Sequence, residues 1–307
     1  MTENPNRGNQ QVPGSADRSI NIAVIVPMLD AADTVGEQLE ALTRQTFAGD
    51  WEVVVADNGS RDRSREVALG YGERLPLRLV DASDIRGVAH ARNVGARATR
   101  APLLAFVDAD DVVADDWLEH IEAALQSHPA VASRFDKARL NPPDLQATRN
   151  LAQEHGLGEH NYARFLPHAG GSGLAVRREV HEAVGGFDER LLRLQDTDYS
   201  WRLQLAGHAL HYEPAAVLHV RFRPSGAASL KQAFLYGRYN GHLYHRYRGR
   251  GMAPASLVTD LKLIAILLVK LPFGRDPLQR SRRQRTLANV AGILWGRLEA
   301  RLGRSRA

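Results

Sequence analysis

The sequence has no cysteine among its 307 residues. Disulfide bonds, thiolate metal sites and a cysteine nucleophile are therefore excluded. The C-terminal region also lacks a long apolar run, because its uninterrupted run Leu263–Val269 has only seven residues. A helix that spans a bilayer needs roughly 20 apolar residues, so this run is too short to cross a membrane.

Glycine-rich phosphate-binding loops are absent as well. The turn at 27–34, PMLDAADT, lacks the G-x-G-x-x-G of a dinucleotide site, and G-x-x-x-x-G-K-[ST] does not occur in the chain. These absences disfavour an NAD enzyme and a P-loop enzyme. A nucleotide would instead be bound through acidic side chains, together with a metal. Residues 1–19 are polar and lack the apolar segment of a secretory signal, which predicts a disordered tail.

Charge is distributed unevenly along the chain. Residues 221–307 contain 18 Lys and Arg and three Asp and Glu, a balance of +15, so the remaining residues carry −10 of the total of +5. An acidic body followed by a strongly basic region indicates an anionic partner for that region. Nucleic acid and an anionic membrane surface are the two candidates.

Short apolar segments alternate with segments of helical periodicity over the first 130 residues. This alternation predicts an α/β fold with a mixed, mostly parallel sheet flanked by helices. The expected strands are 20–29, 51–57, 77–81 and 102–108, and the expected helices are 34–45, 60–72, 87–99 and 117–127. A less regular stretch, 136–170, is expected to hold one helix, and the next strand is expected at 209–222.

Acidic residues end three of these strands. Asp57, Asp81 and Asp108 each lie at the carboxyl end of a strand, where ligands bind in open α/β sheets, so we expect them to converge. The segment FVDADD at 106–111 adds Asp110 and Asp111 to Asp108. Carboxylates packed this closely repel one another. A divalent metal, a basic side chain or water on an exposed turn would each relieve that repulsion.

Five motifs occur in an order that resembles the family 2 glycosyltransferases, which have the GT-A fold. The resemblance runs from Ile20 to about Tyr247. The motifs are VIVPMLDAADTVGEQLEAL (24–42), EVVVADNGSRDRS (52–64), RGVAHARNVGARATRAPLLAFVDADD (86–111), GSGLAVRREVHEAVGGFDE (171–189) and QDTDYSWRLQLAGH (195–208). The resemblance implies a GT-A catalytic domain at 20–225 that is an inverting, nucleotide-sugar-dependent transferase.

The same resemblance implies a donor site and a metal site. The residues expected at the nucleotide sugar are Pro27, Asp57, Arg86, Arg92, Asn93, Asp108, Ala109 and Asp110. Asp110, Asp108 and His219 are expected to bind Mn²⁺ or Mg²⁺, since these cations prefer oxygen ligands and imidazole is a reasonable addition. Asp111 is expected to cap the following segment. For Arg92 a salt bridge to one of the strand-end acids is the open alternative, and Arg221 and Arg223 are expected to face the departing diphosphate.

Catalysis requires a base for the acceptor hydroxyl, and the resemblance assigns this role to Asp196. Asp198 would point elsewhere on the same helix, and Arg202 is expected to orient one of the two acids. The family usually has Glu just before the base, where this chain has Gln195. The acceptor side is expected to include Gly186, Gln195 and Trp201, although Trp201 suits the core equally well.

The C-terminal region 226–307 is expected to form basic, amphipathic helices at 229–251, 257–273 and 280–306. Such helices suit an anionic membrane surface, with packing on the catalytic domain or on a second copy as the alternative. We therefore expect a cytoplasmic protein, peripheral at the inner face of the plasma membrane. Nucleic acid is the less favoured partner, and a homo-oligomer is left open.

The expected function is transfer of a sugar from a nucleoside-diphosphate donor to an acceptor hydroxyl. The acceptor is expected to be a saccharide or a lipid-linked molecule of cell-envelope polysaccharide, glycolipid or glycoconjugate synthesis. The alternative is a non-catalytic protein on the same fold that binds nucleotide sugars or carbohydrate, which the neutral amide of Gln195 makes worth testing.

Overall fold

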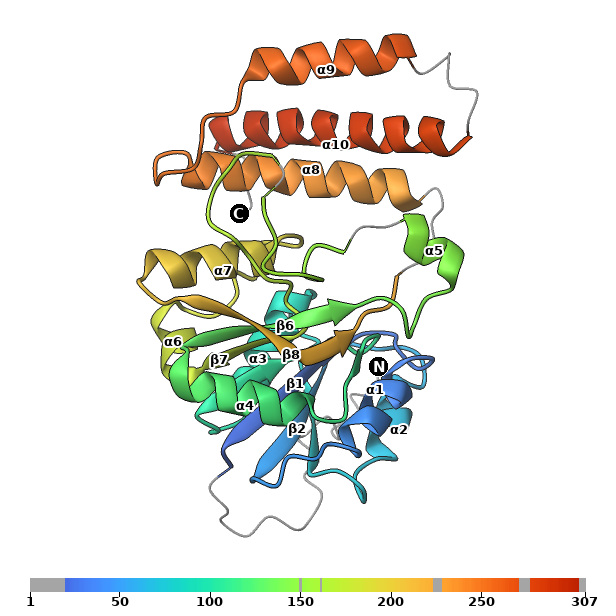
Figure 1. Ribbon diagram of the computed structural model, residues 1–307, viewed down its shortest axis with the longest axis vertical. Helices are drawn as coiled ribbons and strands as arrows, with labels where there is room; N and C mark the ends of the chain where they lie inside the picture. The colour runs from blue at the N-terminus through green and yellow to red at the C-terminus, as the bar shows by residue number, and fades with distance from the viewer. Residues whose placement is uncertain (1–19, 149–150, 161, 223–227, 271–276, 304–307) are drawn as a thin grey trace, which may run out of the picture. The chain divides into compact units, whose positions relative to one another are not determined.

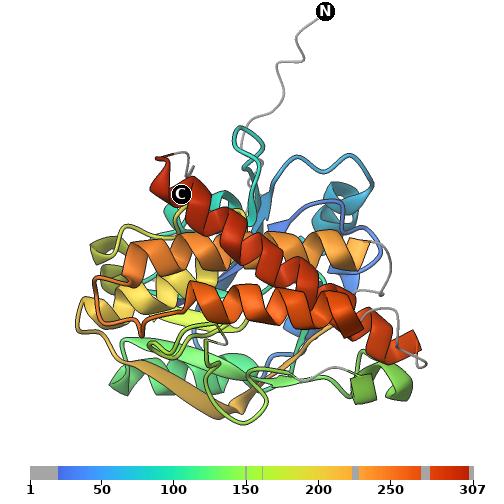
Figure 2. The same cartoon turned by 90° about the horizontal axis from the view of Figure 1, so that it is seen from above.

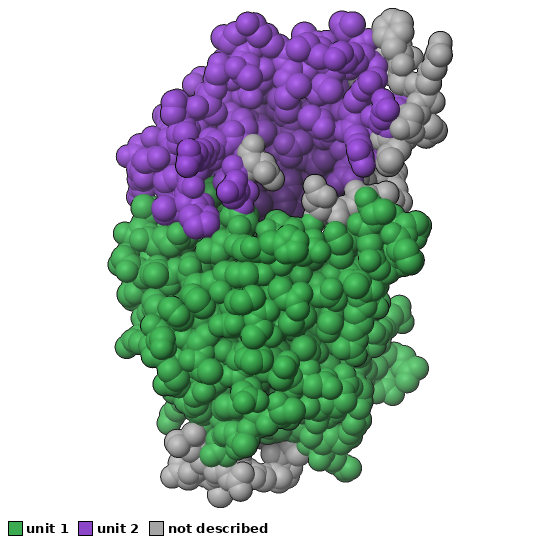
Figure 3. Space-filling model, viewed as in Figure 1, with its two compact units in different colours: residues 1–158, 168–189, 195–222 green, residues 159–167, 190–194, 223–307 purple. Residues whose placement is uncertain are grey.

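The structure is a computed structural model that describes residues 20–148, 151–160, 162–222, 228–270 and 277–303. The expected tail at 1–19 and Arg223 lie outside the described residues. The chain divides into two compact units (Figure 3). Unit 1 comprises 1–158, 168–189 and 195–222, and unit 2 comprises 159–167, 190–194 and 223–307.

Unit 1 is built on one mixed sheet whose described strands follow the order β3-β2-β1-β4-β7-β6-β8-β5. The first four strands in this order run parallel, β7 is antiparallel to both β4 and β6, and β8 is parallel to β6 but antiparallel to β5. The expected mixed, mostly parallel sheet is therefore confirmed. The strands are β1 (Ile22–Met28), β2 (Trp51–Asp57), β3 (Leu77–Asp81), β4 (Leu103–Phe106), β5 (Val112–Val113), β6 (Ala130–Asp136), β7 (Leu174–Arg177) and β8 (Leu210–His219).

Helices cover both faces of this sheet (Figure 1). The helices of unit 1 are α1 (Val35–Leu42), α2 (Ser64–Leu69), α3 (Val88–Arg97), α4 (Trp117–Ser127), α5 (Pro143–Thr148), α6 (Arg178–Ala183) and α7 (Gln195–Leu205). α1, α2 and α4 pack on one face, and α3, α6 and α7 pack on the other. The helix expected within 136–170 is present as α5.

The strand β1 shows why both faces must be covered. Val24 and Val26 belong to the core on the α1 side, whereas Ile25 belongs to the core on the α3 side. All three are fully buried, and each such side chain contributes about 1.5–3 kcal/mol on burial. Gly95 lets α3 approach closely, since a Cβ there would lie 2.5 Å from Cγ2 of Ile25.

Unit 2 is dominated by three helices, α8 (Ala228–Tyr247), α9 (Leu257–Lys270) and α10 (Pro277–Arg301). α10 lies between α8 and α9 and is packed closely on α8 (Figures 1 and 2). Within the described residues, no helix has the length and apolarity that crossing a bilayer requires.

Glycines bring the backbones of α8 and α10 together. A Cβ at Gly237 would lie 1.9 Å from the carbonyl oxygen of Asn289, and one at Gly296 would lie 1.9 Å from that of Arg238. Gly241 and Gly292 make equivalent close approaches. The two helices therefore cross through two facing G-x-x-x-G patterns.

The domain boundary expected at 225 stays a prediction, and the two compact units differ from it in one respect. The short segments 159–167 and 190–194 group with the C-terminal helices. In the first segment, His160 contacts the side chain of Asn240 on α8 at 2.9 Å. This pairing spans 80 residues of sequence, which is why a local pattern did not indicate it.

Candidate active site

The parallel strands β3, β2, β1 and β4 end at the same side of the sheet, and acidic residues lie there as expected. Asp57 and Asp81 are register partners at the ends of β2 and β3. Asp108 follows β4 by two residues. Asp81 is exposed and accepts a hydrogen bond from the amide of Ser83, which makes it a local turn residue.

Asp57 is buried and held from two directions. Its Oδ2 accepts a hydrogen bond from Nη1 of Arg65 at 2.7 Å, and its Oδ1 accepts one from the amide of Ser60 at 3.1 Å. Gly59 makes the intervening turn possible, because its φ of 88° is unfavourable for other residues. The carboxylate therefore occupies one orientation at the end of β2.

The three carboxylates of Asp108, Asp110 and Asp111 form a cluster. One ligand oxygen from each lies within 4.8 Å of the others, so the three side chains could hold one metal ion. Burial, and then the neighbouring carboxylates, raise the pKa of Asp111 to about 8. A cation bound among the three groups would offset both effects.

Asp111 does not cap the following segment, so this prediction was wrong. Its Oδ2 accepts a hydrogen bond from the hydroxyl of Ser172 at 2.7 Å, and its Oδ1 accepts one from the amide of Arg221 at 3.0 Å. The side chain turns inward because these two donors, from distant parts of the chain, meet it in the core. Asp111 is therefore the third member of the candidate metal cluster.

Arg92 forms the salt bridge that was the open alternative to a nucleotide contact. Its Nη2 lies 2.6 Å from Oδ1 of Asp108, and the side chain is buried. Its guanidinium also lies over the ring of Phe187, 5.3 Å from the ring centroid. Its Nε and Nη1 are buried without a hydrogen-bond partner among the described residues.

Asp196 stands in the first turn of α7, where its carboxylate is fixed by backbone amides. Oδ2 accepts a hydrogen bond from the amide of Gly171 at 3.1 Å, and Oδ1 accepts one from Thr197 at 2.8 Å. Ser172 follows Gly171 in the chain. Its hydroxyl donates a hydrogen bond to Asp111 and accepts one from the amide of Asp108 at 2.9 Å. The segment 171–172 thus connects Asp196 to the acidic cluster.

The neighbours of Asp196 on α7 have different roles. Asp198 is fully buried and pairs with Nε of Arg202 at 2.7 Å. Arg202 also donates hydrogen bonds to the carbonyl groups of Val184 and Gly186. It therefore orients Asp198, as one of the two predicted options, and ties α7 to the turn at 185–189. Gln195 is buried, and its Oε1 has no partner within the described part of the chain.

Asn93 holds the turn at 185–189. Its Oδ1 accepts a hydrogen bond from the amide of Phe187, and its Nδ2 donates to the carbonyl oxygen of Phe187 and to Glu189. Gly186 has a φ of 68°, and a Cβ there would lie 2.7 Å from Oδ1 of Asn93. The amide of Asn93 is thus engaged by the protein on the predicted acceptor side.

His219 is not a member of the acidic cluster. Its Nδ1 lies 2.6 Å from Oδ2 of Asp136, which fixes the ring at the end of β8. Arg221 is also engaged, since Nε donates to the carbonyl oxygen of Asp110 and Nη2 pairs with Glu37 at 2.9 Å. The metal role of His219 and the diphosphate role of Arg221 both stay predictions.

The other predicted site residues occupy different environments. Pro27 is buried within β1, and Ala109, between Asp108 and Asp110 in the chain, is buried in the hydrophobic core. Arg86 is exposed in the loop before α3. Trp201 is fully buried beside His168, with the ring centroids 6.5 Å apart, which favours its core alternative over the acceptor side.

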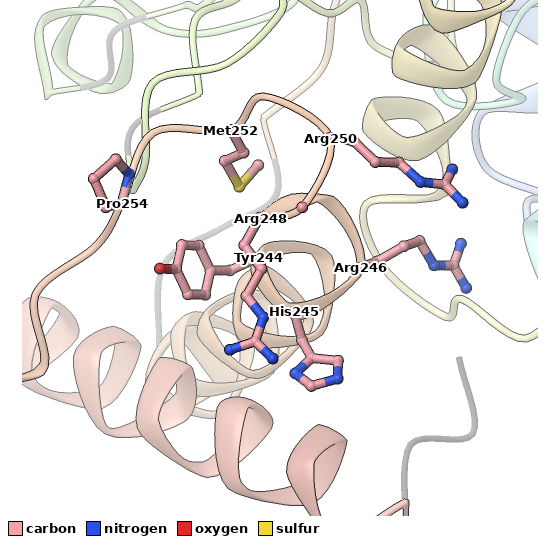
Figure 4. Close-up of a pocket in the computed structure, with 8 residues that line it drawn as sticks. Tyr244, His245, Arg246, Arg248, Arg250, Met252 and Pro254 are labelled. Carbon is pink, nitrogen blue, oxygen red and sulfur yellow. The ribbon is translucent and has the colours of Figure 1, made fainter.

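A hollow of about 660 Å³ is formed within unit 2 at the C-terminal end of α8 (Figure 4). The side chains of Arg246 and Arg250 extend to the same side in this view. None of the described residues that line the hollow is acidic, so these side chains are unsuited to a cation. It is lined by Tyr244, His245, Arg246, Arg248, Gly249, Arg250, Met252 and Pro254.

A family model described as glycosyl transferase family 2 matches residues 23–185, more than half of the chain. The matched region includes the acidic cluster and its partner Ser172. The chain belongs to glycosyltransferase family 2. The prediction from the five motifs is therefore confirmed, and the protein is a glycosyltransferase.

Curated relatives support this assignment at low identity. AglE of Haloferax volcanii is 26% identical over 235 residues, which cover 71% of this chain and 72% of AglE. The pre-mycofactocin glycosyltransferase of Mycobacterium tuberculosis is 27% identical over 301 residues, or 94% of this chain and 59% of the relative. The chain spans 27% of a validoxylamine A glucosyltransferase of Streptomyces hygroscopicus that it also matches.

Solved structures place the glycosyltransferase in the predicted fold. The mannosyltransferase PcManGT of Pyrobaculum calidifontis, in complex with GDP-Man and Mn²⁺, matches with a TM-score of 0.65 and 21% identity. The match covers 90% of this chain and 87% of that chain. At this identity the likeness concerns the fold, and it confirms the expected GT-A architecture.

Two features of the candidate site were missed by sequence reasoning. Ser172 was quoted within a motif but was given no role, because its partners Asp111 and Asp108 lie 61 and 64 residues away in the sequence. His90 lies between two carboxylates, with Nδ1 2.7 Å from Glu189 and Nε2 2.7 Å from Asp84. Only Asp84 is close to His90 in the sequence, so a local pattern could indicate that contact but not the contact with Glu189.

Proposed function

We propose that this glycosyltransferase moves a sugar from a nucleoside-diphosphate donor to an acceptor hydroxyl, with inversion at the anomeric carbon. The observation that carries the proposal is the segment 171–172. Through it, the carboxylate of Asp196 and the acidic cluster of Asp108 and Asp111 are connected by consecutive residues. A base and a site for a diphosphate must lie within reach of one sugar, and a shared backbone segment supports that requirement.

The donor is proposed to bind at the carboxyl ends of β2 and β4. Asp57 would accept hydrogen bonds from the nucleobase, since its orientation is fixed by Arg65 and Ser60. Arg86 is exposed in the adjacent loop and would reach the diphosphate, because a guanidinium group suits phosphate oxygens. The GDP-Man bound to PcManGT supports a nucleotide-sugar donor.

Asp108 and Asp110 are proposed to hold Mn²⁺ or Mg²⁺, with Asp111 as the third acidic neighbour. The residues fit such an ion, because three carboxylate oxygens lie within 4.8 Å of one another and hard divalent cations prefer oxygen ligands. A bound divalent cation stabilises negative charge on a departing diphosphate. The Mn²⁺ in the complex of PcManGT supports this assignment. His219 stays a candidate for a further ligand.

Asp196 is proposed as the general base. Both of its oxygens are held by backbone amides, which fixes the carboxylate without using all of its acceptor capacity. It would take the proton of the acceptor hydroxyl while that oxygen forms a bond to the anomeric carbon. The bond from the anomeric carbon to the diphosphate oxygen breaks in the same displacement, so the configuration inverts.

The acceptor is proposed to be a saccharide or a lipid-linked molecule of the cell envelope. The turn at 185–189, held by Asn93 and Arg202, is proposed to shape the acceptor side together with Gln195. Residues 229–306 are proposed to place the enzyme at the inner face of the plasma membrane. Their basic, amphipathic character supports that position.

The deciding experiment measures donor binding and turnover separately. UDP-, GDP- and dTDP-sugars are screened for thermal stabilisation that requires Mn²⁺, and turnover of the best donor is then assayed. Asp196→Asn is expected to keep donor binding and to lose about 10²–10⁴-fold in turnover, since it removes a general base. Asp116→Asn, an exposed carboxylate outside the site, is the matched control. Donor binding without turnover in the unaltered protein would instead favour the non-catalytic alternative.

A further inference from the structure

The helix α9 is apolar on most of its circumference and packs through a narrow face. Only Asp260 and Leu267 are buried, and Asp260 is tied to α10 through Arg297 at 3.2 Å. Seven large apolar side chains of α9 are 36 to 67% exposed: Leu257, Val258, Leu261, Leu263, Ile266, Leu268 and Val269. A contiguous exposed apolar surface of this kind marks a site that contacts a membrane or another molecule.

The surroundings of α9 are strongly basic. Residues 228–270 and 277–303 contain 13 Lys and Arg against two acidic residues, Asp260 and Glu299. Both acids are neutralised within the unit, since Glu299 pairs with Arg238 at 2.6 Å and Asp260 pairs with Arg297. The charge offered to an outside partner is therefore positive. Lys262 and Lys270 carry it at both ends of the apolar run.

This combination favours one occupant over the others. A second copy of the chain would bring an equally basic surface against this one, which is unfavourable. A membrane-spanning arrangement is excluded for α9 because 14 residues are too few. An anionic bilayer satisfies both features, since its acyl region accepts the apolar side chains and its headgroups accept the lysines and arginines.

The hollow at the end of α8 adjoins the start of α9. Tyr244, which lines the hollow, accepts a hydrogen bond from the amide of Ala255 at 3.1 Å, two residues before α9 begins. Arg248 and Arg250 line this hollow and are exposed, so they add to the positive charge near the start of α9.

We infer that α9 lies flat in the headgroup region of an anionic lipid bilayer, with its exposed apolar side chains inserted and with Lys262 and Lys270 on lipid phosphates. This docking surface rests on the membrane position proposed above for 229–306 and assigns it to α9. Lipid binding through α9 does not require turnover of a donor.

The first test is flotation of the full chain with vesicles of phosphatidylcholine alone or mixed with phosphatidylglycerol. The protein is expected to float with the anionic vesicles and to be released by salt. Leu261→Glu combined with Leu268→Glu is expected to weaken partitioning at least about tenfold, because two inserted side chains are lost. Both positions are about half exposed, so the fold is retained. Leu69→Glu, at an exposed leucine of α2, is the matched control and is expected to float normally.

A second readout uses the absence of cysteine. Leu261→Cys and, as control, Leu69→Cys each give a single position for an environment-sensitive fluorophore. The label at 261 is expected to brighten with anionic vesicles, and the label at 69 is expected to stay unchanged. Equal binding by the double Glu variant, binding to neutral vesicles alone, or no flotation would overturn the inference. A dimer in solution that the double variant dissociates, or salt-sensitive binding to duplex DNA in place of vesicles, would overturn it too.

Failure of the docking surface and failure of the proposed function are distinguishable. A protein that floats but does not turn over any donor keeps the docking surface and loses the proposed reaction. A protein that turns over a donor with a soluble acceptor, but ignores vesicles, keeps the reaction and loses the docking surface.

Discussion

Gly171 donates a backbone hydrogen bond of 3.1 Å to Asp196, 25 residues further along the chain. The same glycine also lies against Arg92, because a Cβ at 171 would fall 2.3 Å from Nη1. Arg92 in turn pairs with Asp108. The proposed base and the acidic cluster therefore depend on one backbone segment, and a side chain at 171 would displace the guanidinium group of Arg92. Small changes in this segment are expected to affect both.

Ser172→Ala tests whether this segment supports the acidic cluster. The change removes the hydroxyl that donates to Asp111 and that accepts from the amide of Asp108. Unsatisfied buried groups of this kind cost about 1–3 kcal/mol, so the free energy of unfolding is expected to fall by that amount. The stabilisation by Mn²⁺ and donor is expected to shrink as well. Urea unfolding and thermal shifts with and without Mn²⁺ measure the two effects.

Ser200→Ala is the matched control for this change. Ser200 is fully buried and accepts a hydrogen bond from the amide of Ala169 at 3.1 Å, but it takes no part in the cluster. The Ser200→Ala protein is expected to lose a similar free energy of unfolding and to keep its thermal shift with Mn²⁺. If Ser172→Ala kept that response to the same degree, the segment would have no role in arranging the carboxylates.

The position of the acidic cluster could be predicted from sequence, because it depends on local rules. A buried apolar segment such as 103–106 continues as a strand, and parallel strands deliver their carboxyl ends to one side of a sheet. The role of Asp111 could not be predicted in this way. Its donor Ser172 is 61 residues away, and its donor Arg221 is 110 residues away. Only tertiary packing brings them together.

Asp111→Asn is expected to separate stability from metal binding. Burial and the neighbouring carboxylates raise the pKa of Asp111, so this carboxyl group is costly in the metal-free protein. In the Asp111→Asn protein the amide oxygen can keep the hydrogen bond from the backbone amide of Arg221, and the NH₂ group can face the hydroxyl of Ser172, which is also able to accept. The change is therefore expected to raise the metal-free free energy of unfolding by about 1 kcal/mol. The thermal shift produced by Mn²⁺ is expected to fall. Calorimetry in EDTA and in Mn²⁺ checks both.

Asp115→Asn is the comparison for this prediction. Asp115 is 55% exposed and pairs with Arg44 at the surface, so its change is expected to alter stability by less than about 0.5 kcal/mol and to leave the response to Mn²⁺ intact. A destabilised metal-free Asp111→Asn protein would show that the three carboxylates are not in conflict in the absence of a cation.

Gly237→Ala is expected to destabilise unit 2, which is the opposite of what helix propensity alone predicts. In a solvated helix the same change would stabilise the protein by about 1 kcal/mol. Here the new Cβ would lie 1.9 Å from the carbonyl oxygen of Asn289, and a backbone atom of a packed helix cannot move aside cheaply. A loss of about 1–3 kcal/mol or more is expected. Thermal unfolding followed by circular dichroism measures it.

Gly249→Ala provides the control, since a Cβ at 249 meets no atom of the described residues within 4 Å. Its stability is expected to stay within about 0.5 kcal/mol of the unaltered protein. Equal stability of the two variants would mean that α8 and α10 do not cross as closely as described. The two G-x-x-x-G patterns are visible in the sequence, but a pattern of small residues does not say which helix faces which. Their pairing therefore had to come from the structure.

His90 is expected to make stability depend on pH. It is buried on α3 between Asp84 and Glu189, and Arg97 lies 3.9 Å from the second oxygen of Glu189. Burial works against the charged ring, but the hydrogen bonds to the two carboxylates prevail and raise the pKa of His90 above its ordinary value of 6.5. A raised folded-state pKa contributes stability that is complete below the unfolded-state pKa and is lost as the pH rises through the folded-state pKa.

The stability advantage of the unaltered protein over His90→Asn should therefore decline from mildly acidic to alkaline pH. Urea unfolding at a series of pH values measures the decline. A flat difference for His90→Asn over this range would mean that the ring stays neutral between its two carboxylates.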